Sequence, residues 1–110
     1  AIVVQSSDPI SLAFDRLGES QHRGLVVVDR GWPVGLFAQR EALAAKDAPS
    51  GSPVDAFMSP SIVCVPPDYP AHRVAARAAA VRPRAVFVTD GPEVVALVTA
   101  LDFARLVAEG

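Results

Sequence analysis

Short apolar runs alternate along the whole chain with polar segments that contain Gly or Pro. Residues 25–28 and 94–98 are the clearest of these runs, and runs of four to eight apolar residues are typical of buried strands. Between such runs, apolar side chains recur at helical spacing, and this spacing predicts a helix with one apolar face in the segment that contains Ile10, Ala13, Phe14 and Leu17. Residues 71–81 are rich in alanine and predict a second helix that a neighbour can approach closely.

The same pattern occurs twice. A shift of 60 residues takes Asp8 onto Asp68, residues 26–28 onto 86–88, and Gly31 onto Gly91. We place one inserted residue after this turn, so that a shift of 61 takes Leu36 onto Leu97 and Glu41 onto Asp102. Each half then reads strand, helix, strand, turn, strand, helix. The predicted elements are 1–4, 10–17, 25–28, 34–37 and 39–45 in the first half, and 62–65, 71–81, 85–88, 94–98 and 101–108 in the second.

This order predicts the topology of each half. A helix that joins two strands makes them parallel with a right-handed crossover, whereas a tight turn makes the third strand antiparallel. One three-stranded sheet covered by two helices buries too little surface to be stable alone, so we expect the two sheets to pack against each other. The expected fold class is α/β (α+β), with pseudo-twofold symmetry between two small mixed sheets. The expected division is 1–46 for repeat 1, 47–60 for the linker and leading helix of repeat 2, and 61–110 for repeat 2.

Composition narrows the class of protein. A length of 110 residues with 51% apolar residues suits one compact domain, and no apolar run approaches the ~18 residues of a membrane span. A net charge of −2 argues against a nucleic-acid partner. The lone Cys64 lies in an apolar run and is expected to be a small buried hydrophobe. With no leader pattern, a cytoplasmic location is expected.

Catalytic patterns are missing from the sequence. His22 and His72 lie on different repeats, without a neighbouring acid and nucleophile, and they form no zinc spacing with the single cysteine. Neither a Gly-rich phosphate loop nor a nucleophile elbow is present. We therefore expect no enzyme, no metal and no required cofactor.

The motifs of the second half resemble the CBS family. They are the run Val54-Asp55-Ala56-Phe57-Met58-Ser59-Pro60, the strand and loop 62–68, the segment 86–88, Gly91, and the segment 96–102. The resemblance covers nearly the whole chain as a tandem pair, or Bateman module, although repeat 1 lacks its leading helix, which suggests a fragment of a longer protein. It implies a disc-like unit, a homodimer, and an adenosine-containing ligand between the repeats: AMP, ADP, ATP or S-adenosylmethionine. It also implies control of an attached or partner effector domain.

The resemblance also indicates a site in the second repeat. Thr99 ends a predicted strand and Asp102 follows three residues later, where a hydroxyl and helix N–H groups suit a phosphate and a carboxylate can accept ribose hydroxyls. The expected ligand-binding residues are Thr99, Ala100, Asp102, Arg84 and Ile62. The same Thr-x-x-Asp spacing resembles a helix capping box, so capping and ligand binding both remain open.

The first repeat departs from this pattern. Ala38 and Glu41 stand where the second repeat has Thr99 and Asp102, so we expect a degenerate second site there. Gly35 also corresponds to Ala96, whose methyl group narrows the second pocket. At most one good nucleotide site is expected. The two functions left open are a ligand-sensing regulatory module and a ligand-free dimerisation or assembly module.

Overall fold

The computed structural model describes residues 2–19 and 24–99 of the 110-residue chain. The first repeat contains β1 (Val3–Gln5), α1 (Ile10–Glu19), β2 (Leu25–Asp29), β3 (Trp32–Phe37) and α2 (Gln39–Ala44). A one-turn 3₁₀ helix, η1 (Val54–Ala56), lies in the connector. The second repeat contains β4 (Ile62–Val65), α3 (Ala71–Val81), β5 (Ala85–Asp90) and β6 (Glu93–Thr99). The closing helix predicted over 101–108 lies outside the described residues.

Both repeats have the predicted strand topology. The strand orders are β1-β2-β3 and β4-β5-β6, and in each sheet the first pair is parallel and the second pair is antiparallel. The crossover helices α1 and α3 impose the parallel pairing, because a two-residue turn can join only antiparallel neighbours. The mixed α+β fold with two small sheets is therefore confirmed.

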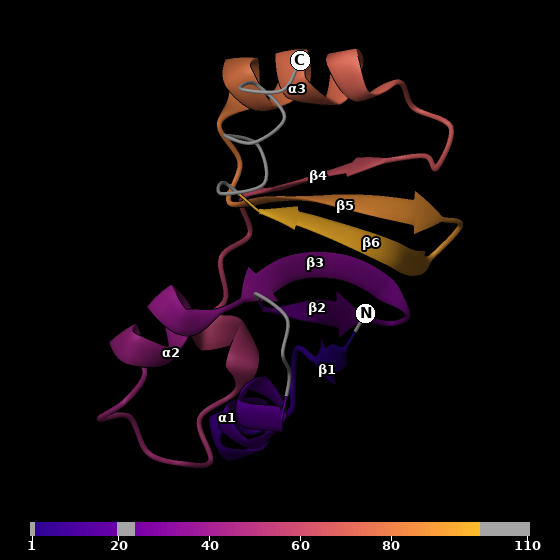
Figure 1. Cartoon of the computed structure of the whole chain (residues 1–110). Coiled ribbons are helices and arrows are strands. Elements are labelled where there is room, and N and C mark those ends of the chain that lie inside the picture. The colour runs from indigo at the N-terminus through magenta and orange to yellow at the C-terminus, as the bar shows by residue number, and fades with distance from the viewer. Residues whose placement is uncertain (1, 20–23, 100–110) are drawn as a thin grey trace.

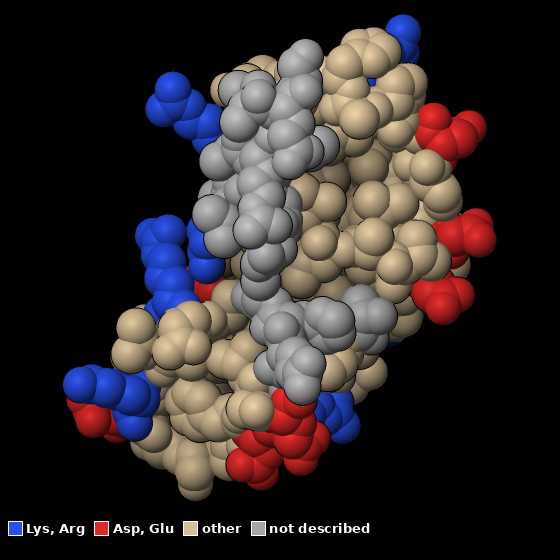
Figure 2. Space-filling model, in the orientation of Figure 1, with Lys and Arg blue, Asp and Glu red and all other residues tan. Residues whose placement is uncertain are grey.

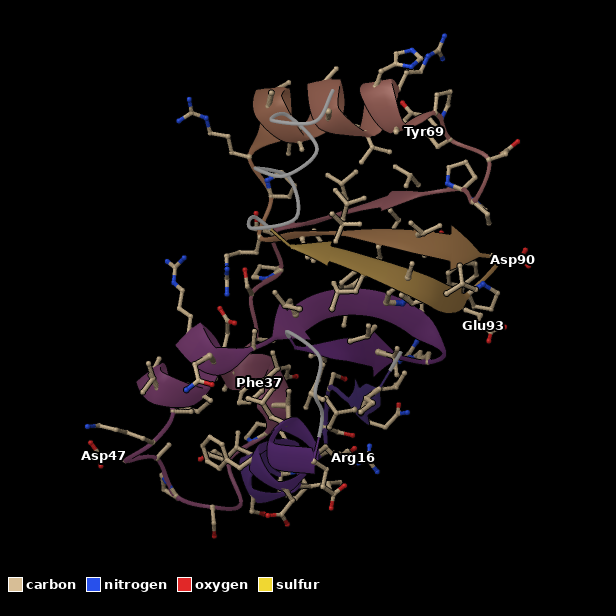
Figure 3. The ribbon with its side chains drawn as sticks, viewed as in Figure 1. Arg16, Phe37, Asp47, Tyr69, Asp90 and Glu93 are labelled. Carbon is tan, nitrogen blue, oxygen red and sulfur yellow. The ribbon has the colours of Figure 1, made fainter. Side chains whose placement is uncertain are left out.

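The molecule is layered, with helices outside and two sheets inside. Figure 1 shows α3 above the second sheet, and α1 with the connector below the first. The sheets face each other across one apolar cluster, to which both contribute: Val26, Val28, Leu36, Ala38, Ala85, Phe87 and Val94. A separate cluster, which includes Phe37 (Figure 3), fills the space between the first sheet and its helices. In it Phe14 on α1 meets Phe37 edge to face, with ring centroids 6.0 Å apart.

The register between the repeats differs from the one expected from the sequence. Val26 and Phe87 both lie in the cluster between the sheets, whereas Val86 faces α3, so the shift over β2 and β5 is 61, not 60. The positions of the β-bulges agree with a shift of 61, since one bulge lies between Val27 and Val28 and the other between Val88 and Thr89. A one-residue slip would turn every side chain to the opposite face. The inserted residue therefore precedes β5 and does not follow the turn.

The connector is attached to the first repeat. The N–H of Ile10, at the start of α1, donates to the Ser52 carbonyl (2.8 Å), and the N–H of Val54 donates to the Asp8 carbonyl (2.9 Å). Val54 is fully buried in the core of repeat 1. The helix predicted before repeat 2 is thus reduced to η1, and the start of α1 receives its acceptors from this segment's backbone.

The chain then crosses the edge of β3 on its way to the second repeat. Leu36 and Ser59 exchange two backbone hydrogen bonds of 2.9 Å. Beside them, a Cβ atom on Gly35 would lie 2.7 Å from both the Met58 sulfur and the Ser59 carbonyl oxygen. Only glycine fits at this crossing without a shift of the connector.

Candidate functional site

The candidate site lies where the first turn of α2 meets the start of β5, across the boundary between the repeats. Ala38 precedes α2 in an extended conformation and has no side-chain acceptor for the free N–H groups of the helix. Glu41 supplies one missing partner, because its Oε1 accepts the N–H of Ala38 at 3.0 Å. The carboxylate is thereby fixed at the end of the first sheet.

Arg84 approaches the same carboxylate from the second repeat. Its Nη2 donates to Oε1 of Glu41 at 3.0 Å and to Oε2 at 3.2 Å, and its Nε lies 3.4 Å from Oε2. The backbone N–H of Arg84 donates to the Ser61 carbonyl (2.7 Å), which fixes the base of the side chain. A forked guanidinium–carboxylate pair of this kind is stronger and more directional than a single neutral hydrogen bond.

The two partners differ in burial. The Glu41 side chain is 7% exposed and that of Arg84 is 26% exposed. Among the described residues, Glu41 is the one charged residue that is buried. A carboxylate removed from water needs partners, and here the helix N–H and the guanidinium provide them. Both oxygens of the Glu41 carboxylate therefore already accept hydrogen bonds from within the chain.

The predicted site residues of the second repeat share one end of its sheet. The strand register places Ile62 on one side of Ala85 and Thr99 on the other, and Arg84 directly precedes Ala85. Ile62 is half-buried against the cluster between the sheets. The side chain of Thr99, together with Ala100 and Asp102, lies outside the described residues. The sequence did not predict the contact between Arg84 and Glu41. The available signal was that Glu41 is an acid at the third position of α2, whose preceding residue Ala38 cannot cap the helix.

Charge is distributed unevenly around the molecule. On the face shown in Figure 2, Lys and Arg gather mainly along the left edge, whereas Asp and Glu lie mainly on the right edge and in a patch at the bottom. Figure 3 places Asp90 and Glu93 at the right, at the tip of the hairpin between β5 and β6. The start of β5, with Arg84, lies at the opposite end of that sheet (Figure 1). The positive edge of the molecule therefore coincides with the candidate site.

Cys64 is exposed, so the expectation of a buried cysteine was wrong. Val63 and Val65 face α3, which turns Cys64 to the other face of β4, at the edge of its sheet. Its structural counterpart in the first sheet is the half-buried Val3, because Val3 pairs with Val26 and Cys64 pairs with Phe87, in agreement with the corrected register. Partial burial nevertheless raises the pKa of the Cys64 thiol above its ordinary value.

The described residues contain no group of three or more His, Cys, Asp and Glu side chains placed to hold a metal ion. His72 is exposed at the start of α3, and His22 lies outside the described residues. The longest helices in the described part of the chain, α1 and α3, have 10 and 11 residues, and none is long and apolar enough to cross a membrane.

Comparison with known proteins yields one family. The family model "CBS domain" matches residues 54–109. A CBS-domain-containing protein from Kribbella flavida has 23% identity and a TM-score of 0.74, covering 99% of this chain and 92% of its own. CBSX2, solved in complex with AMP, has 23% identity and a TM-score of 0.69 over 97% of this chain and 87% of its own. The cytosolic domain of the Mg²⁺ channel MgtE, solved with ATP, has 20% identity and a TM-score of 0.72 over 96% and 44%. No curated protein sequence matches the chain.

Proposed function

Because the chain belongs to the CBS domain family, we propose that it is a regulatory module and not an enzyme. In this proposal it binds an adenosine-containing ligand in the cleft between the repeats and controls an attached or partner domain. AMP, ADP, ATP and S-adenosylmethionine are the candidate ligands. The proposal includes a cytoplasmic location and a homodimer.

The observation that carries the proposal is the meeting of strand ends from both repeats at one edge. Ile62, Arg84 and the end of β6 lie there side by side, next to the start of α2 from the other repeat. A ligand held at this edge contacts both repeats, and it biases their arrangement only as far as its affinities for two arrangements differ. The positive edge in Figure 2 favours a ligand with phosphate groups or another negative charge. Two proteins of the same fold, CBSX2 and MgtE, were solved with AMP and with ATP.

The second repeat is the better place for this ligand. Thr99 and Asp102 supply a hydroxyl and a carboxylate at the spacing that the first repeat has lost, and Ile62 and Ala100 complete the proposed contacts. Glu41, in the first repeat, is already engaged by Arg84 and by the N–H of Ala38. Arg84 is thus fixed by an acidic partner rather than held ready for a phosphate.

Thermal unfolding tests the proposal. The purified chain is heated alone and with each of the four ligands near millimolar concentration. A ligand at 100 times its dissociation constant adds ~2.7 kcal/mol to the free energy of unfolding, which raises the Tm by several degrees. We expect one ligand to do so, and we expect Asp102→Ala to weaken its binding by at least ~10-fold, about 1.4 kcal/mol. Asp90→Ala, at the distant hairpin tip, is the matched control.

The second candidate function is a ligand-free assembly module. The first repeat has Ala38 and Glu41 where the second has Thr99 and Asp102, and the second has Ala96 where the first has Gly35, so each repeat departs from the ligand-binding pattern. This function predicts a stable dimer whose Tm no nucleotide changes. Sedimentation at tens of micromolar distinguishes the two: a monomer that responds to a ligand refutes assembly, and a dimer that responds to none refutes sensing.

A further inference from the structure

We infer that the Glu41–Arg84 pair joins the two repeats and takes the place of a ligand between Arg84 and the start of α2, where Ala38 and Glu41 correspond to Thr99 and Asp102 of the second repeat. This position is called the first cleft. The chain would then bind at most one nucleotide, in the cleft of the second repeat. The number of ligands rests on the proposed function, whereas the joining of the repeats by this pair does not.

The acceptor capacity of Glu41 supports this inference. A carboxylate offers about four lone-pair positions. Oε1 receives the Ala38 N–H and Nη2 of Arg84, and Oε2 receives Nη2 and Nε of the same guanidinium. A ribose hydroxyl would have to displace one of these donors. Because residue 38 is alanine, no hydroxyl in the first repeat replaces the one that Thr99 supplies in the second.

A phosphate gains little at the same place. Arg84 attracts anions, but its Nη2 lies 3.0 Å from Oε1 of Glu41, so a phosphate on this guanidinium would lie beside a buried carboxylate. Two neighbouring negative charges away from bulk water repel strongly. If a phosphate instead drew Arg84 away from Glu41, the buried Glu41 carboxylate would keep only the Ala38 N–H as a hydrogen-bond donor. Both routes into the first cleft are therefore unfavourable.

The same geometry predicts that the two partners are not equally important. Arg84→Gln leaves a carboxylate that is 7% exposed without its cation, whereas Glu41→Gln leaves a guanidinium that is 26% exposed and can reach water. An unsatisfied buried group costs more than an exposed one. We expect Arg84→Gln to lower the folding equilibrium constant by at least ~10-fold and by more than Glu41→Gln does.

A double-mutant cycle in urea tests the joining role without any ligand. The four chains are wild type, Glu41→Gln, Arg84→Gln and the double variant, with Arg77→Gln on the exposed surface of α3 as the charge-matched control. We expect a coupling of at least ~3-fold in the folding equilibrium constant between positions 41 and 84. A control effect within ~2-fold is expected. Coupling below ~1.5-fold overturns the inference, whatever the chain binds.

Calorimetric titration tests the number of sites, with the nucleotide that raises the Tm most as the probe. We expect one nucleotide per chain, and an affinity that changes by less than ~3-fold in Glu41→Gln. Two nucleotides per chain, or a 10-fold loss of affinity in Glu41→Gln, would overturn the inference while leaving the proposed function intact. If no nucleotide binds but positions 41 and 84 remain coupled, the proposed function fails and the joining role is supported.

Discussion

Replacement of Gly35 by alanine is expected to destabilise the protein, although the same change in an open strand would stabilise it. Glycine within a strand costs about 0.5–1 kcal/mol relative to alanine, because it loses more conformational freedom on folding. At Gly35, however, the new Cβ would lie 2.7 Å from the Met58 sulfur and 2.7 Å from the Ser59 carbonyl oxygen. The sulfur ends a flexible side chain and can move, but the carbonyl is part of the backbone.

The magnitude follows from what holds that carbonyl in place. Ser59 exchanges two hydrogen bonds of 2.9 Å with Leu36, each worth about 1 kcal/mol net. Movement of the connector by the required distance weakens both, and strain in a packed core typically costs about 1–3 kcal/mol. We expect Gly35→Ala to lose about 1–3 kcal/mol of unfolding free energy, which lowers the Tm by at least about 4 °C.

Urea and thermal unfolding followed by circular dichroism measure this loss. Ala96→Gly is the control, because Ala96 is the counterpart of Gly35 in β6 and is exposed. We expect this control to lose no more than about 1 kcal/mol, from strand entropy alone. A Gly35→Ala protein that is as stable as wild type, or more stable, would refute the argument that the crossing requires glycine.

Two further outcomes follow from burial. Phe87→Ala empties a fully buried position between the sheets, so we expect it to lose about 3–5 kcal/mol of unfolding free energy in urea. The control Val95→Ala, at a side chain that is 49% exposed, should lose far less. Equal losses in the two variants would contradict the packing of the sheets through Phe87. Because the pKa of the Cys64 thiol is raised, less thiolate is present near neutral pH, and iodoacetamide should alkylate the folded protein more slowly than a peptide of residues 61–67. The alkylation rate should rise about tenfold per pH unit below that pKa. Faster alkylation of the folded protein than of the peptide would contradict the raised pKa.

The fold could be predicted from the sequence because its signals are local and occur twice. The bounds of α3 agree with the predicted 71–81, and those of β4 with 62–65. The crossover rule then determined which strands are parallel. The shift of 60 failed over β2 and β5 because Val26-Val27-Val28 resembles Val86-Phe87-Val88 in either register. Only the packing of Phe87 between the sheets decides which face each residue occupies.

The candidate site was less predictable for a physical reason. Glu41 and Arg84 are 43 positions apart, and the acid at the third position of α2 indicates only its local bond to the N–H of Ala38. Their contact depends on how the first sheet packs on the second, which no local pattern encodes. The exposure of Cys64 has the same origin, since an apolar run does not indicate which of its residues occupies the open face of an edge strand. Thr99 and Asp102 remain predictions.

The attachment of the connector to the first repeat also affects the order in which the chain can fold during synthesis. The sequence repeat ends near residue 46, but Val54 belongs to the core of repeat 1 and Ser59 pairs with Leu36. A nascent chain that has emerged only as far as residue 46 therefore lacks Val54, which belongs to that core, and Ser59, which forms hydrogen bonds with Leu36 at the edge of β3. The first half can complete its structure only after the ribosome has released the chain as far as Ser59, so its completion coincides with the emergence of the connector and not with the end of the sequence repeat.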